Sequence, residues 1–301
     1  MSATSSPATG RTYGLERVCS TWGMPRSSFY ARRATANDDA KPVPGKRGPK
    51  PKISDEDLLA AIKVDLATTP FVGEGHRKVW GRLRIRSGIR VAANRVLRLM
   101  RQNKLLSPRR GRQAPANLHD GKIITDAPNI MWGTDGARVL TLEDGWVWIF
   151  TAVEHWNAEC VGWHVCKKGD RYAALQPVSM ALTKLYGSTA ADAARGLALR
   201  MDHGSQYLSG HFTNQIKFWG ITPSYAFIEQ PQTNGVAERF NGTFKEQIIH
   251  GRIYRNLAEL REAMREFIER YNSQWLVEKM GYLTPYQARQ AWFEERMPRA
   301  A

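Results

Sequence analysis

PQTNGVAERFNGTFKEQ, residues 231–247, opens with a turn and continues as a helix. Its apolar side chains recur every three or four residues, which is typical of one face of a helix. These side chains are Ala237, Phe240, Phe244 and Ile248. Glu238, Asn241 and Lys245 share a different face. Because the N-terminal end of a helix is partly positive, an acidic residue there is common, and this stretch alone favours a structural role for Glu238.

The composition indicates a globular protein that binds an anionic polymer. The chain has 301 residues, enough for two domains or for one domain with appendages, and 42% of them are hydrophobic. Its formal net charge of +16 favours nucleic acid as a partner over a membrane surface. Three scattered cysteines are too few for a disulfide framework. The longest apolar run, residues 146–153, is too short to cross a bilayer, and the first residues lack a secretory signal pattern. We therefore expect a soluble cytoplasmic protein without membrane contact.

The positive charge is concentrated in one segment, residues 75–112. This segment contains 13 Lys or Arg residues and no Asp or Glu, so it supplies 13 of the 16 net charges. A solvated basic face is the ordinary role of such a run. With no acidic residue inside the segment to balance the cations, DNA binding through phosphates is the favoured interpretation, and it is expected to weaken steeply with salt. The predicted DNA contacts in this segment are Arg77, Lys78, Arg82, Arg95, Arg98 and Arg101.

The basic segment falls within a predicted helix-turn-helix domain. Ser54 followed by Asp57 is a helix-capping pattern ahead of a run of apolar positions with helical spacing. Two further helices are expected over residues 77–86 and 91–105, with Gly88 in the turn between them. The expected organisation of this half is a helical segment that contains a small helix pair, then a basic linker, then the helix-turn-helix domain: residues 1–42, 43–53 and 54–113.

After residue 126 the pattern changes to strands. The apolar runs and turn signals predict five strands and three helices in the order β-β-β-α-β-α-β-α. The strands are expected over residues 129–140, 145–153, 159–167, 197–201 and 221–227. The helices are expected over residues 172–186 and 209–219 and around Glu238. This order predicts an α/β fold with a mixed five-stranded sheet flanked by helices.

Three acidic residues occupy related places in this pattern. Asp135 lies in the middle of the first strand, Asp202 at the end of the fourth, and Glu238 in the first turn of the last helix. The first and fourth strands can lie side by side in a sheet with right-handed crossovers, so the three acids can meet at one edge. Their mutual repulsion would be relieved by a divalent cation, and all-oxygen ligands suit Mg²⁺.

The spacing and surroundings of these acids resemble a known family. Thirty-five residues separate Asp202 from Glu238, and with Asp135 this resembles the D,D(35)E signature of retroviral integrases and DDE transposases. The local motifs are similar as well: WGTD at 132–135, DHGSQY at 202–207 and PQTNGVAERFNGTFK at 231–245. GHRKVWGRLR, RVLRLMRQNKLL and the C-terminal YN…GYLTP motif are more restrictive. Together they resemble the OrfB-type transposases of bacterial insertion sequences over nearly the whole chain.

The resemblance implies a fold and a mechanism. It implies an RNase H-like catalytic core over residues 126–250 and a helical C-terminal extension over residues 251–301. It also implies that Asp135, Asp202 and Glu238 bind two Mg²⁺ or Mn²⁺ ions, which activate first a water and then a DNA 3′-hydroxyl for in-line phosphoryl transfer. The element's 3′ ends are cut and joined to other DNA without a covalent protein–DNA intermediate.

The resemblance further implies partners and contacts. The partners are the element's terminal repeats, target DNA and further copies of the chain, in a nucleoid-associated assembly, and an OrfA-type partner chain or fusion remains open. Lys245 is expected to hold a DNA phosphate, and Asn241 to line the same helix face. A helix expected over residues 245–270 carries alternating charge and suits either a DNA contact or a second subunit.

Two other functions fit parts of the sequence. A non-catalytic DNA-binding regulator derived from a transposase would need only the basic segment, and it would be free to lose the three acids. A plain RNase H-like nuclease would need neither the helix-turn-helix nor the C-terminal extension. The three acids and both flanking regions therefore favour an active transposase over either alternative.

Overall fold

The computed structural model describes residues 3–36, 51–107, 123–226 and 235–296. The chain divides into two compact units, Met1–Lys52 and Ile53–Ala301. The first unit contains the predicted helix pair, α1 (Leu15–Thr21) and α2 (Arg26–Ala36). Most of the predicted linker, residues 43–53, lies outside the described residues.

The second unit begins with three helices, α3 (Asp55–Thr68), α4 (His76–Ile85) and α5 (Ala93–Gln102). Ser54 caps α3 as predicted, because its hydroxyl accepts a hydrogen bond of 3.0 Å from the Asp57 N–H. The three helices share a small apolar core to which each contributes: Leu58, Ile62, Val79, Leu83, Val96, Leu99 and Met100.

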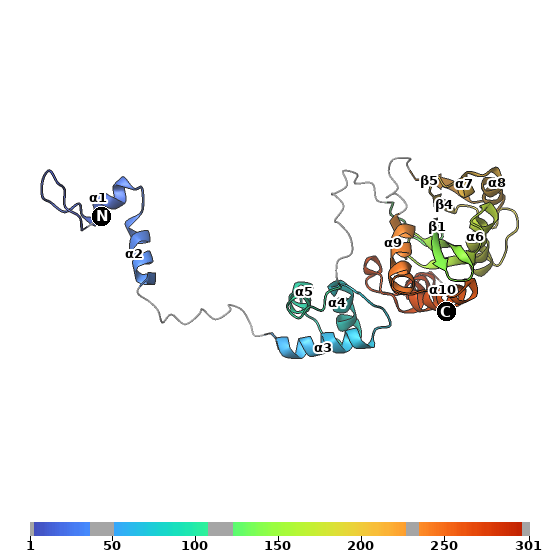
Figure 1. The fold of residues 1–301 in the computed structure, drawn as a ribbon, viewed down its shortest axis with the longest axis horizontal. Coiled ribbons are helices and arrows are strands. Elements are labelled where there is room, and N and C mark those ends of the chain that lie inside the picture. The colour runs from blue at the N-terminus through green and yellow to red at the C-terminus, as the bar shows by residue number, and fades with distance from the viewer. Residues whose placement is uncertain (1–2, 37–50, 108–122, 227–234, 297–301) are drawn as a thin grey trace. The chain divides into compact units, whose positions relative to one another are not determined.

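A five-stranded mixed sheet forms the centre of the second unit (Figure 1). Its strands lie in the order β3-β2-β1-β4-β5; β1, β2 and β3 are antiparallel neighbours, whereas β4 and β5 run parallel to β1. The fold class predicted from the sequence, a mixed five-stranded sheet flanked by helices, is confirmed. The strands are β1 (Met131–Thr141), β2 (Gly145–Glu154), β3 (Cys160–Cys166), β4 (Ala198–Met201) and β5 (Thr222–Tyr225).

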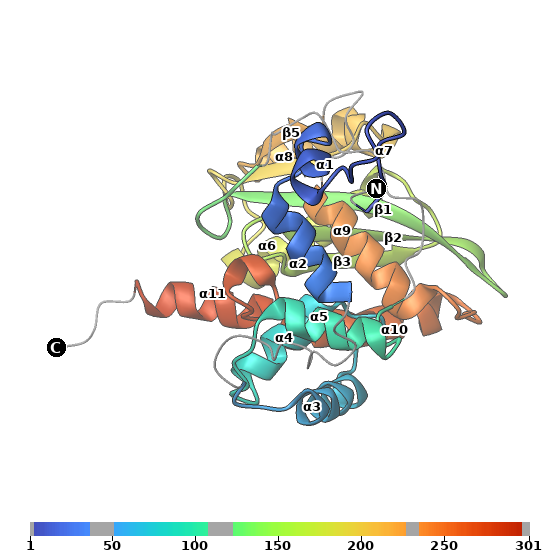
Figure 2. The same ribbon diagram turned by 90° about the vertical axis from the view of Figure 1, so that its left-hand side faces the viewer.

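Helices cover both faces of the sheet (Figures 1 and 2). One face packs against α6 and α8 around Trp132, Phe150 and Phe212, with the short α7 beside them. The other face packs against α9 and α10 around Phe240 and Phe267. The helices of the two faces are α6 (Arg171–Tyr186), α7 (Ser205–Leu208), α8 (Gly210–Phe218), α9 (Gly235–Phe244) and α10 (Leu257–Gln274).

The chain after α9 differs from the prediction of one helix over residues 245–270. The helix widens into a π-helical turn, η2 (Lys245–Ile249), and then ends. Gly251 has a positive φ of 78°, which a right-handed helix cannot accommodate, and Tyr254 forms a bridge with Thr141 of β1. A new helix, α10, starts after the Asn256 cap. Because α10 packs into the core beneath the sheet, it belongs to the same packed body rather than to a separate extension.

Two short elements complete the described chain, η3 (Glu278–Met280) and α11 (Pro285–Glu294). Thr284 and Gln287 form a reciprocal capping box at the start of α11. Among the described helices, none combines the length and the apolar character needed to cross a bilayer.

Candidate active site

The three predicted acids come from neighbouring elements. β1 carries Asp135, and the parallel strand β4 beside it ends one residue before Asp202. This confirms the prediction that the first and fourth strands are adjacent. α9 packs across β1 and β2, and Glu238 lies in its first turn. The fold therefore directs all three acids to one region of the sheet.

The pKa directions of two acids show charge interactions that involve Asp135. Burial raises the pKa of Asp135 above its usual range, and the negative charge of Asp202 raises it further, while the Gly136 N–H and Asn241 lower it. Burial also raises the pKa of Glu238, with a further contribution from Asp135. These effects place Asp135 within electrostatic reach of both Asp202 and Glu238.

Asn241 has a different role from the DNA contact that the sequence predicted. It is only 4% exposed, and its Nδ2 donates a hydrogen bond of 2.6 Å to Asp135 Oδ2. Its Oδ1 accepts one of 3.2 Å from the Thr151 hydroxyl, and Thr151 is the cross-strand partner of Asp135. A buried side chain cannot line a DNA surface, so Asn241 instead fixes the orientation of the Asp135 carboxylate.

Lys245 lies where it can act on the acids. Its positive charge lowers the pKa of Asp135, and its side chain is only partly buried. It therefore combines proximity to the acids with access to solvent. A DNA phosphate contact by Lys245 stays a prediction.

The arrangement and the chemistry of the three acids bear differently on metal binding. Among the described residues, no three His, Cys, Asp or Glu side chains are arranged so that they could hold a metal ion. The chemistry of the donors nevertheless fits Mg²⁺, because all three candidate ligands are carboxylates. Two of them have pKa values raised by another member of the set, and this is the repulsion that a bound cation would relieve.

Arg82 is corrected from a DNA contact to a buried structural residue. It is 3% exposed, and its guanidinium pairs with Asp65 at 2.7 Å and also with Glu74. Both carboxylates lie just outside the segment that contains no acid. Asp65 and Glu74 therefore neutralise part of the positive charge of residues 75–112, which contain no acidic residue of their own.

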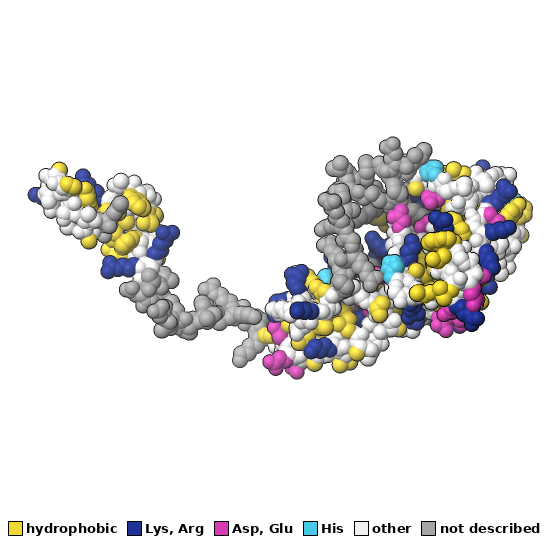
Figure 3. Space-filling model, in the orientation of Figure 1, with side chains coloured by type: hydrophobic (Ala, Val, Ile, Leu, Met, Phe, Trp, Pro, Cys, Tyr) yellow, Lys and Arg dark blue, Asp and Glu magenta, His cyan; other side chains and the backbone are white. Residues whose placement is uncertain are grey.

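The remaining cations of the three-helix region vary in accessibility. The Lys78 Nζ is largely buried over the Trp275 ring, 4.0 Å from Glu74, which does not suit a DNA contact. Arg77 pairs with Glu278 at 2.9 Å but stays exposed. Arg95 and Arg98 both pair with Asp55, at 2.7 and 2.6 Å, and Arg101 is exposed. Figure 3 shows Lys and Arg side chains on the surface of this region.

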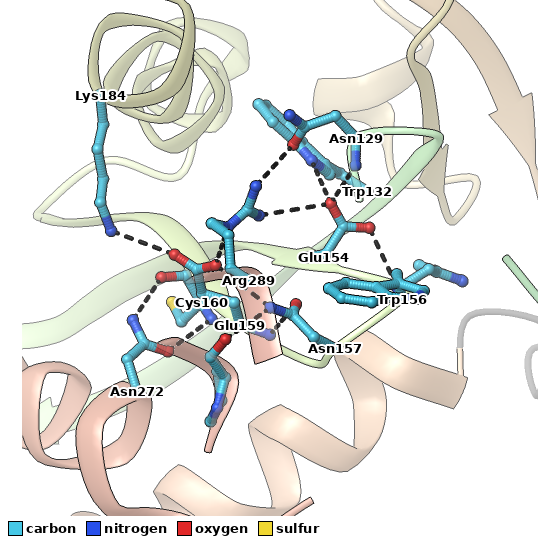
Figure 4. Close-up of polar contacts among 12 residues, drawn as sticks. Asn129, Trp132, Glu154, Trp156, Asn157, Glu159, Cys160, Lys184, Asn272 and Arg289 are labelled. Atoms are coloured by element: carbon cyan, nitrogen blue, oxygen red, sulfur yellow. Dashed lines mark hydrogen bonds and ion pairs between the residues drawn. The ribbon is translucent and has the colours of Figure 1, made fainter. Parts of the chain in front are cut away.

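The structure also contains a buried polar cluster that the sequence analysis missed (Figure 4). Glu154 and Glu159 are almost fully buried. Arg289 of α11 lies between them; its Nε donates to Glu159, and its Nη2 is 3.6 Å from Glu154. Asn272 of α10 both accepts from and donates to the backbone of Cys160, at 3.0 and 2.9 Å.

This cluster explains the C-terminal YN…GYLTP motif. Tyr271 donates to the Ala158 carbonyl, and the Pro285 carbonyl accepts from Asn157 at 2.9 Å. The motif thus fastens α10 and α11 to the turn between β2 and β3. The signal of this cluster in the sequence was Asn272 followed by a helix that starts with a capping Thr and a Pro. The partners of these residues lie more than a hundred positions earlier in the chain, so the signal did not reveal them.

Comparison with known proteins finds integrase core domains and insertion-sequence transposases. Two models, both described as integrase core domain, match residues 125–231 and 219–285. A transposase for insertion sequence element IS629 of Shigella sonnei is 28% identical over 229 residues, which span 73% of this chain and 74% of the relative. A putative transposase for IS986/IS6110 of Mycobacterium tuberculosis is 27% identical and spans 75% of this chain and 85% of the relative.

Similarity to solved structures is lower. The catalytic core domain of HTLV-2 integrase in complex with magnesium shares 16% identity over 54% of this chain and 97% of that chain, with a TM-score of 0.38.

The chain carries an integrase core domain, matched over residues 125–285 by the two models together. Together with the insertion-sequence relatives, this match supports a transposase with a retroviral-integrase-like core. Its assignment to the OrfB type stays a prediction.

Proposed function

We propose that this transposase cuts the 3′ ends of an insertion sequence and joins them to other DNA by in-line phosphoryl transfer. The observation that supports the proposal is that β1, β4 and α9 are neighbours and bring Asp135, Asp202 and Glu238 toward one region of the sheet. There the charge of Asp202 raises the pKa of Asp135, and the charge of Asp135 raises the pKa of Glu238. Strand transfer without a covalent intermediate needs positioned carboxylates and DNA contacts, and needs no protein nucleophile.

The roles of the residues follow from where they lie. Asp135, Asp202 and Glu238 would hold two Mg²⁺ or Mn²⁺ ions. When bound, the ions would supply Lewis-acid activation of the attacking hydroxyl and stabilise charge on the leaving oxygen. Asn241 keeps the Asp135 carboxylate in one orientation through its 2.6 Å hydrogen bond. Lys245 places a positive charge beside the acids, where it would contact a DNA phosphate.

The proposed substrates are the terminal repeats of the element and the target DNA. The exposed cations of the three-helix region, Arg77, Arg98 and Arg101, would contact the phosphates of the terminal repeats. We further propose that the chain acts as a homo-oligomer on DNA, since both ends of an element must be brought together. An OrfA-type chain is a further proposed partner.

The decisive experiment is a strand-transfer assay on pre-cut candidate element ends in Mg²⁺ or Mn²⁺. It compares the wild type with Glu238→Gln, which keeps the shape of the side chain and removes its charge. The matched control is Glu246→Gln, because Glu246 is an exposed acid shortly after the same helix. DNA affinity is measured for all three proteins.

We expect the wild type and the control to join DNA, and Glu238→Gln to bind DNA but to lose joining by at least about a thousandfold. Equal joining by all three proteins would show that Glu238 is not a catalytic ligand. Binding without joining by all three, in the presence of a candidate partner chain as well as alone, would favour the non-catalytic regulator.

A further inference from the structure

A group of basic side chains lies beside the candidate active site and takes no part in the roles described above. Arg200 is two positions before the second acid, at the end of β4, and Arg239 directly follows the third acid in α9. Lys279 belongs to η3, and His155 belongs to the turn between β2 and β3. We call these four residues the basic cluster.

Backbone contacts bring three members of the cluster together. His155 donates its N–H to the Met131 carbonyl of β1 at 2.9 Å. Arg200 is paired with Gly133, which is two residues further along β1. Because positions two apart face the same side of a sheet, His155 and Arg200 are directed to one face. Lys279 joins them there, since its Nζ donates to the His155 carbonyl.

The burial and the partners of the cluster are unusual for basic groups. His155 is only 4% exposed, and neither of its ring nitrogens has a hydrogen-bond partner within the described chain. Arg200 is also buried, and its Nη1 donates to the Ser224 hydroxyl at 2.9 Å. No ion pair between Arg239 or Lys279 and a carboxylate occurs among the described residues, although both side chains reach the surface.

Electrostatic effects within the cluster agree with this geometry. Burial lowers the pKa of His155 to about 4, and the charges of Lys279 and Arg200 contribute to the lowering. Burial also lowers the pKa of Lys279, against the opposing effect of Glu154, and Arg239 lowers it further. The four residues therefore share one region of positive potential, in which His155 stays neutral at pH 7.

We propose that the basic cluster binds a phosphodiester of the DNA strand that enters the candidate active site. Like charges gathered at partly buried positions are stabilised by an anion, and guanidinium and ammonium groups are strong hydrogen-bond donors to phosphate oxygens. Arg239 and Lys279 contact the phosphate from the surface, and Arg200 and His155 lie behind them. This inference rests on the proposed function, because the phosphodiester belongs to the proposed substrate.

The test uses the full chain and a double variant, Arg239→Gln with Lys279→Gln. The matched control is Arg195→Gln with Lys217→Gln, which removes the same charge from exposed positions before β4 and in α8. The affinity of each protein for DNA with pre-cut ends is measured without divalent ions at several salt concentrations. Single methylphosphonate substitutions near the 3′ end then neutralise one phosphate at a time.

We expect the double variant to lower the slope of log affinity against log salt by about 1 to 2, and the control to leave it unchanged. One methylphosphonate should weaken wild-type binding by about fivefold to tenfold and have no effect on the double variant, because the contact is already lost. An unchanged slope, or a methylphosphonate effect that persists in the double variant, would overturn the inference.

The wild-type joining assay separates this inference from the proposed function. If the wild type joins DNA in Mg²⁺ while the double variant keeps the wild-type slope, only the basic cluster is misassigned. If the wild type neither binds nor joins DNA, the proposed function and the phosphodiester site both fail.

Discussion

At the scale of single residues, Asn241 tests whether the orientation of Asp135 matters for catalysis. We predict that Asn241→Leu lowers the rate of strand transfer by about tenfold or more, because a charge-assisted hydrogen bond to the carboxylate is worth about 1.5–3 kcal/mol. DNA affinity should stay within about twofold of the wild type, since Asn241 is buried. Single-turnover joining and binding are measured on the same DNA. An unchanged joining rate would show that Asp135 needs no such restraint.

Lys78 gives a prediction about pH and stability. Burial lowers its pKa from 10.5 to about 6, so between these values the unfolded chain binds a proton that the folded chain does not. Stability therefore rises with pH across this window, by at most about 1.4 kcal/mol per pH unit from this group, and falls as the pH drops toward 6.

Lys78→Met should remove this dependence. We expect the variant to melt above the wild type at pH 7 and to lose most of that advantage at pH 9. At pH 9 the free-energy cost of deprotonating Lys78 on folding is smaller, because the pH is closer to the ordinary pKa of lysine. Thermal unfolding of both proteins at the two pH values measures the difference. A constant difference in Tm between pH 7 and pH 9 would show that Lys78 stays charged in the folded state over the Trp275 ring.

At the scale of elements, local sequence signals predicted what local interactions decide. β2 begins at Gly145 as expected, because a turn signal precedes a long apolar run. The Ser54 cap was also predicted correctly, because the two residues that form it lie three positions apart in the sequence. The prediction of one helix over residues 245–270 was wrong. The charged residues keep helical spacing through this segment, but the bridge between Tyr254 and β1 interrupts the helix.

Contacts between distant residues could not be read from the sequence. Arg82 looked like an unbalanced cation because its partners Asp65 and Glu74 lie outside the basic segment. Asn241 shares a helical face with Glu238, but only the packing of α9 on β1 shows that its amide is buried against Asp135. The positions of candidate site residues were thus predictable, whereas their exposure was not.

The attachment of α11 supplies a prediction at the same scale. Arg289→Met would leave Glu154 and Glu159 buried without their guanidinium partner, which costs about 3–5 kcal/mol. We expect Tm to fall by roughly 10 °C. Arg296→Met, at an exposed position just after the same helix, should change Tm by no more than about 2 °C. Equal Tm values for the two variants would contradict a structural role for Arg289.

At the scale of the whole second unit, the three-helix region is fastened to the catalytic half. The backbone of Val72 exchanges two hydrogen bonds with the Gln247 side-chain amide, of 3.0 and 2.8 Å. The Trp80 ring packs edge-on against Tyr282, with centroids 5.5 Å apart. Since Gln247 belongs to the π-helical turn that directly continues α9, the position of α3, α4 and α5 is linked to that of the helix carrying Glu238.

This link predicts that Gln247 aligns bound DNA with the acids. Gln247→Ala should lower the joining rate by about tenfold, because a small displacement between bound DNA and the catalytic groups is costly, while DNA affinity and Tm stay close to the wild type. Glu246→Ala, at the exposed neighbouring position, is the matched control. If Gln247→Ala joins DNA at the wild-type rate, the two regions act independently. If the DNA affinity of Gln247→Ala falls as much as its joining rate, the Gln247 side chain supports DNA binding itself. Other contacts then set the alignment of the DNA with the acids.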